Sequence, residues 1–81
     1  DPALQDRRRS GKDAIVRRLQ RAKRIGDLPA DSEPRALADY LDLVLRGMSS
    51  KARDGATRAQ LRAAADIALA AWPASARNLA D

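Results

Sequence analysis

The fold of this chain is decided by the stretch PRALADYLDLVLRGMSSKARDGATRAQLRAAADIALAAWP, residues 34–73. Each of two predicted helices has one narrow polar stripe, made of Arg35, Asp39, Asp42 and Arg46 in the first and Arg58, Arg62 and Asp66 in the second, where Gln60 lies off the stripe. Residues three or four apart share a helix face. Most of each circumference is therefore apolar, whereas a surface helix of a small monomer needs an apolar stripe only about 100° wide. This pattern predicts that a partner covers both helices.

Start and stop signals divide the stretch into helices over residues 34–52 and 57–72. Gly55 supplies the left-handed residue that ends the first helix. Thr57 and Gln60 form a capping box for the second. Pro34 marks the start of the first helix, because proline suits a first helical position. Pro73 marks the end of the second, because the residue before a proline disfavours helical geometry. Since the connector is so short, the two helices should be antiparallel neighbours.

A third helix is predicted over residues 3–25, ahead of the other two. Ser10 and Gly11 interrupt it, either as a tolerated interior glycine or as a new helix start. Gly26 follows a basic last turn as a glycine cap. The polar linker, residues 27–33, leaves open which of its last three residues caps the next helix. No strand is predicted, so the fold class is all-α, an antiparallel helical bundle. Because the last two helices need a partner, we expect them to pair with a second copy in a four-helix dimer interface.

Length and composition limit the classes of protein. The 81 residues make one small domain, and a chain of this size buries only about 60–65% of its unfolded surface, so its own stability is marginal. The first residue is Asp1 rather than methionine, and we expect a piece of a longer protein. The absence of cysteine excludes disulfides. Without a signal peptide or a long apolar run, we expect a cytoplasmic protein with no membrane partner.

Charge is concentrated at the N-terminal end. Residues 1–26 hold nine basic and three acidic side chains, a net +6, which leaves −1 for the remainder of a chain whose total is +5. Such asymmetry can indicate a nucleic-acid partner. However, the segment has no aromatic residue for base stacking and no grouped amides for reading base edges. A solvated outer helix face is the commoner interpretation, and a free-standing basic nucleic-acid-binding protein acting through residues 7–24 is the alternative.

Catalytic chemistry has little support in the residues. The chain contains no histidine and no cysteine, so the commonest general base and the commonest zinc ligands are missing. Asp39 and Asp42 lie one turn apart, but Arg35 and Arg46 flank them on the polar stripe, which is typical of a solvated face. No base is available to activate a serine. We therefore predict no catalytic residues, no metal, no cofactor and no enzyme activity.

Several segments at matching spacing resemble the C-terminal end of TetR-family transcriptional repressors. They are RAKRIGDLP (residues 21–29), PRALADY (34–40), RGM (46–48), ARDGAT (52–57) and the closing AAWP (70–73). The resemblance covers about residues 15–73, and one departure is Glu33 before Pro34, where the family often has Asp or another good cap.

The resemblance implies a homodimer of ligand-responsive repressors. The last two helices would pair with those of the second subunit, and this chain would form the dimerisation end and part of the effector-sensing domain. DNA would be read only by an N-terminal helix-turn-helix that is absent from these residues. The small-molecule effector and its ligand-binding residues stay unknown. The apolar residues that we place at the dimer interface are Leu37, Tyr40, Leu41, Val44, Gly47, Met48, Leu61, Ala64, Ala65, Ala68 and Trp72.

Two points stay open at this stage. Helical spacing does not say which of these apolar residues face the partner and which face the first helix. The chain could also be the basic nucleic-acid binder or a plain structural helical fragment. The coding sequence upstream of Asp1 distinguishes the repressor from the nucleic-acid binder, because only the repressor requires a helix-turn-helix there.

Overall fold

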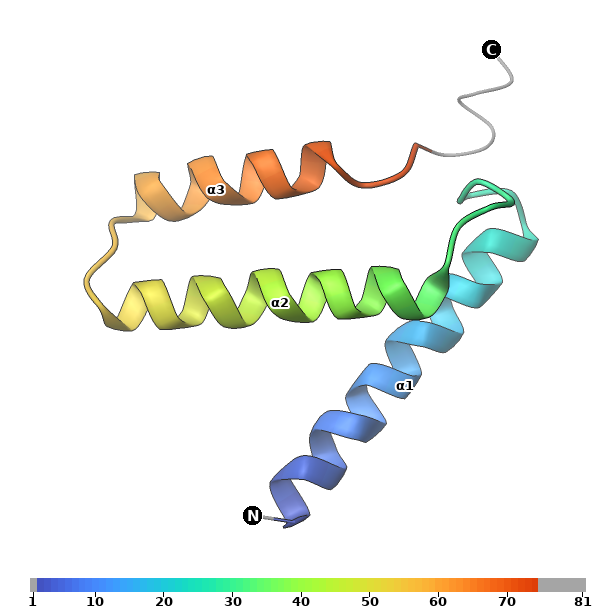
Figure 1. Ribbon diagram of the computed structural model, residues 1–81, viewed down its shortest axis with the longest axis horizontal. Helices are drawn as coiled ribbons and strands as arrows, with labels where there is room; N and C mark the ends of the chain where they lie inside the picture. The colour runs from blue at the N-terminus through green and yellow to red at the C-terminus, as the bar shows by residue number, and fades with distance from the viewer. Residues whose placement is uncertain (1, 75–81) are drawn as a thin grey trace. The chain divides into compact units, whose positions relative to one another are not determined.

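The computed structural model describes residues 2–74, which contain three α-helices (Figure 1). These are α1 (Pro2–Arg24), α2 (Pro34–Arg53) and α3 (Arg58–Ala70). No strand occurs in the described part of the chain, which confirms the all-α class. Each helix end lies within two residues of its predicted position.

The two predicted glycine caps are confirmed by the backbone. Gly26 and Gly55 have φ angles of 88° and 98°, in the left-handed region that glycine adopts without a steric penalty. After α1, the amide of Asp27 donates to the carbonyl of Ala22 at 2.8 Å. After α2, the amide of Ala56 donates in the same way to Lys51 at 2.9 Å. Both helices therefore end in the Schellman arrangement, which satisfies carbonyls that the helix leaves unpaired.

The capping box at the start of α3 is also present. The Thr57 hydroxyl accepts from the Gln60 amide at 3.1 Å, and the Gln60 side-chain oxygen accepts from the Thr57 amide at 2.8 Å. At the other end α3 stops at Ala70, two residues before the predicted end at Trp72. The Trp72 amide bonds to the carbonyl three residues earlier, at 3.0 Å. The last turn is tightened because the residue before a proline avoids helical geometry.

Two alternatives left open by the sequence are resolved. Helix α1 continues through Ser10 and Gly11, so this pair is a tolerated interior interruption and not a new start. At the start of α2, the Glu33 carbonyl accepts from the Leu37 amide at 3.0 Å, which places Glu33 at the cap position. Ser32 does not cap the helix, since its buried hydroxyl has no hydrogen-bond partner in the described residues.

The chain divides into two compact units. The first comprises residues 1–38 and 73–81, of which 2–38 and 73–74 are described. It contains α1, the linker and the first turn of α2. The core of this unit consists of Val16, Leu28 and Ala38, and these are the buried apolar residues of the described chain.

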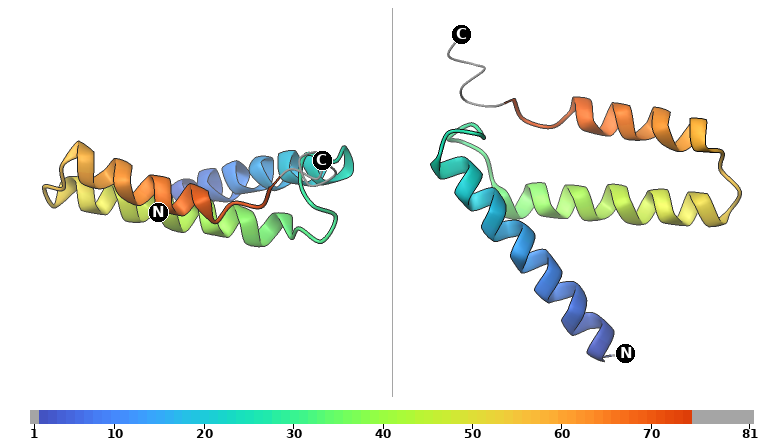
Figure 2. Two further views of the ribbon diagram at one scale, coloured as in Figure 1. Left: turned by 90° about the horizontal axis from the view of Figure 1, so that it is seen from above. Right: turned by 180° about the vertical axis from the view of Figure 1, so that it is seen from behind.

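The second unit, residues 39–72, is a helical hairpin. Its two helices, the rest of α2 and all of α3, run side by side in opposite directions, as the views in Figures 1 and 2 agree. The predicted antiparallel neighbours are therefore present. No residue of this hairpin, all of which the structure describes, is fully buried. An apolar hairpin without a buried residue lacks a core of its own.

Candidate interaction surface

One side-chain hydrogen bond joins the two helices of the hairpin. The Tyr40 hydroxyl of α2 donates to the carbonyl oxygen of Ala68 in α3. Tyr40 is half-buried, and so are Val44 and Met48, which follow it at intervals of four residues. This row is therefore the side of α2 that faces α3.

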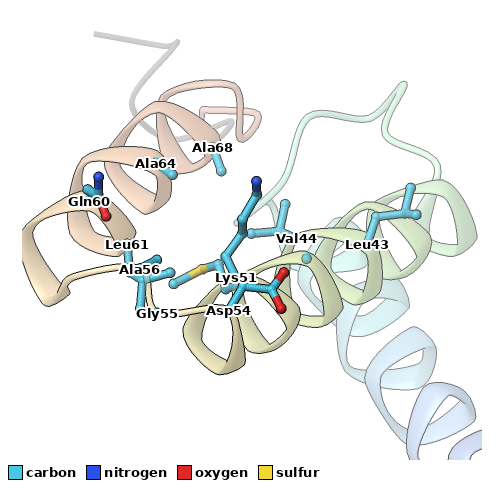
Figure 3. A pocket seen from close by; sticks show the side chains of 12 residues that line it. Leu43, Val44, Lys51, Asp54, Gly55, Ala56, Gln60, Leu61, Ala64 and Ala68 are labelled. Atoms are coloured by element: carbon cyan, nitrogen blue, oxygen red, sulfur yellow. The ribbon is translucent and has the colours of Figure 1, made fainter.

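An open groove runs along the hairpin between α2 and α3. Its volume is about 740 Å³, and Figure 3 shows side chains from both helices around it. It is lined by Leu43, Val44, Gly47, Met48, Lys51, Asp54, Gly55, Ala56, Gln60, Leu61, Ala64 and Ala68. The charged and amide side chains belong to the end nearest the connector, and the other end is apolar. Alanine and glycine make up much of the wall, so a bulky side chain from outside has room to enter.

Four large apolar side chains of the hairpin stand mostly in solvent. Leu43 and Ile67 are 71% and 75% exposed, and Leu45 and Leu69 are 60% and 63% exposed. Single exposed apolar residues are ordinary on protein surfaces. Four such residues on a unit of 34 residues without a core are more than isolated exceptions. Exposed apolar residues that lie together usually mark an interaction site.

Helical spacing sorts these four residues onto two sides. Leu43 lines the groove and lies one turn from Gly47, which also lines it. Ile67 lies one turn from Ala64, on the side of α3 that borders the groove. We call Leu43, Gly47, Ala64 and Ile67 the groove face. Leu45 and Leu69 project from the other side of the hairpin, because two residues along a helix correspond to roughly 200° of rotation.

The polar stripe of α2 faces water, as the sequence predicted. Arg46 and Asp42 form an ion pair of 2.9 Å, and their side chains are 55% and 51% exposed. An exposed pair at this spacing stabilises a helix by only about 0.3–0.5 kcal/mol. The stripe is therefore a solvated face, and the groove face lies outside it.

The eleven residues predicted for the interface occupy two kinds of position. Six line the groove: Val44, Gly47, Met48, Leu61, Ala64 and Ala68. The other five are half-buried in the chain itself: Leu37, Tyr40, Leu41, Ala65 and Trp72. The structure brings the first six together on both walls of one groove. The prediction omitted Leu43, Leu45, Ile67 and Leu69, which are the most exposed large apolar residues among residues 2–74.

Gly47 is one of the small residues predicted for the dimer interface. A Cβ atom added at this position would meet no atom within 4 Å, and Gly47 itself is exposed. Within the hairpin, no neighbouring atom therefore requires a glycine at this position.

Within residues 2–74, no three acidic, histidine or cysteine side chains gather as they would around a metal ion. None of the described helices has the length and apolar character needed to cross a bilayer. The groove face is the feature of the described chain that most resembles a functional site.

No protein-family model, curated protein or solved structure matches this chain. The case for a function therefore depends on the residues and on the geometry described above.

Proposed function

We propose that the α2–α3 hairpin is the dimerisation element of a homodimeric, ligand-responsive transcriptional repressor similar to the TetR family. The observation that carries the proposal is the state of the hairpin, which is mostly apolar, has no buried residue and exposes four large apolar side chains. Burial of apolar surface is the main favourable contribution to most protein association. A second hairpin on the groove side would cover Leu43 and Ile67, two of these four side chains.

The groove face is the side we assign to the second copy. A two-fold axis makes a patch meet its own copy, so the patch must contain both projections and recesses. The groove face has both, since Leu43 and Ile67 project while Gly47 and Ala64 leave space. Two antiparallel hairpins in contact through this face form a four-helix bundle.

The repressor part of the proposal depends on the sequence resemblance. In such a protein an N-terminal helix-turn-helix reads the operator, and helices that precede those seen here form most of the effector pocket. A ligand that prefers one arrangement of the two subunits shifts the population toward it and changes the spacing of the DNA-reading heads. The hairpin transmits this change because it is the junction of the subunits. The protein would act in the cytoplasm, without enzyme activity or cofactor.

Reading the coding sequence upstream of Asp1 tests the repressor proposal. We expect a helix-turn-helix in the same open reading frame: two short helices joined by a 3–4-residue turn. A start codon immediately before Asp1 would contradict the repressor, but it would leave the dimer untouched. The two parts of the proposal can therefore fail separately.

A further inference from the structure

Helix α1 of the first unit carries a second surface feature, a row of arginines. Arg17, Arg18, Arg21 and Arg24 are all exposed, and we call them the arginine face. At 3.6 residues per turn they fall within about 120° of the helix circumference. Arg7 lies close to three turns before Arg18 and extends the same side of the helix. The basic residues of the N-terminal segment thus include an aligned set.

The described residues show no ion pair to this face. None of the four guanidinium groups has a carboxylate partner among residues 2–74. The nearest acidic residue of α1 is Asp13, one turn before Arg17. Like charges three and four residues apart disfavour a helix, and the face contains several such pairs. An anionic partner with several charges would relieve this repulsion.

We propose that the arginine face binds the phosphate backbone of nucleic acid without sequence preference. All four residues are arginine, whose planar group pairs with phosphate in bidentate geometry, whereas the lysines of the chain lie elsewhere. The row is about 10 Å long at 1.5 Å rise per residue, which is the extent of a few phosphates along one DNA strand. Side chains that read base edges are not part of it, so the contacts position the nucleic acid without selecting its sequence.

An anionic membrane fits this helix less well. A helix that lies in a lipid interface needs a broad apolar face, commonly with aromatic residues. Helix α1 contains no aromatic residue, and its exposed large apolar side chains are Leu4 and Ile15. Val16 is already buried in the first unit. The helix has little apolar surface left to insert into lipid.

This inference goes beyond the proposed dimer and does not depend on it. The arginine face belongs to α1, whereas the groove face belongs to the hairpin. Replacing arginines of α1 should leave self-association unchanged. The two ideas therefore fail in different experiments.

The test measures the salt dependence of binding to a short labelled DNA duplex, using the full chain. Four phosphate contacts predict a slope of log K against log salt of about −3.6, read between about 50 and 200 mM. The variant R17Q/R21Q/R24Q should flatten the slope to about −0.9, because one contact remains. The control R53Q/R58Q/R62Q removes the same charge from exposed positions of the hairpin and should keep the original slope. Glutamine is a good helix former, so circular dichroism should show unchanged helix content.

Several results would overturn the proposal. Equal loss of slope in both triple variants would mean that net charge matters and the face does not. An unchanged slope in the α1 variant would place the contacts elsewhere. Binding to anionic vesicles with no binding to DNA would assign the face to a membrane. A tight, sequence-selective complex would contradict the absence of base reading.

Discussion

Replacing the two projecting residues of the groove face should split the dimer. In the double variant L43E/I67E, both substitutions fall on side chains that are 71% and 75% exposed in the single chain. Fully burying a leucine or isoleucine side chain stabilises by about 1.5–3 kcal/mol, so covering the exposed part contributes about 1–2 kcal/mol per residue. Two residues from each of two copies give about 4–8 kcal/mol, which corresponds to at least a roughly thousandfold weaker association in the variant. A buried glutamate without a partner weakens it further.

The matched control is L45E/L69E, which adds the same charge on the other side of the hairpin. Sedimentation velocity at several concentrations gives the oligomeric state, and far-UV circular dichroism gives the helix content. Because all four positions are exposed, both variants should keep their helices. The groove-face variant should be monomeric and the control dimeric. A dimer that survives L43E/I67E, or that is lost equally in the control, would refute the assignment of the groove face.

Five further substitutions, at four positions, test parts of the structure. Gly47→Ala and Gly11→Ala should each stabilise the helix of the single chain by about 0.8–1 kcal/mol, because neither new methyl group meets an atom. Only Gly47→Ala should also weaken association, and an equal dimer constant for both variants by sedimentation would contradict close approach at Gly47. Thr57→Ala should lower the free energy of unfolding by about 1 kcal/mol through loss of the bond to Gln60, whereas Thr57→Ser should cost less than half as much in urea titrations. Ser32→Ala should raise stability by about 1 kcal/mol by removing a buried hydroxyl without a partner, and a lower thermal midpoint would show that the hydroxyl is satisfied.

The positions of the helices were predictable because their signals are local. The left-handed conformations of Gly26 and Gly55 and the capping box at Thr57 depend on residues within one turn. The largest error was the end of α3, at Ala70 instead of Trp72. The effect of Pro73 was anticipated for the residue before it, but the tightening of the last turn extended further back than that.

The orientation of the helix faces was not predictable from periodicity. The apolar arc of α2 is so wide that spacing alone cannot say which part of it meets α3. The hydrogen bond from Tyr40 to the Ala68 carbonyl fixes that choice, and the two residues are 28 positions apart. It turns Leu43 to the groove and leaves it exposed, although nothing in its sequence context distinguishes it from Val44. The division of the chain within α2, after Ala38, has no sequence signal that we recognise.

The most direct test of the central claim is the mass of the wild-type chain by sedimentation equilibrium at tens of micromolar. The dimer predicts twice the chain mass of 8.8 kDa, falling toward 8.8 kDa on dilution as mass action requires. A species of 8.8 kDa at the highest concentration, with its helices intact by circular dichroism, would contradict the account, since the apolar hairpin would then be stable without a partner.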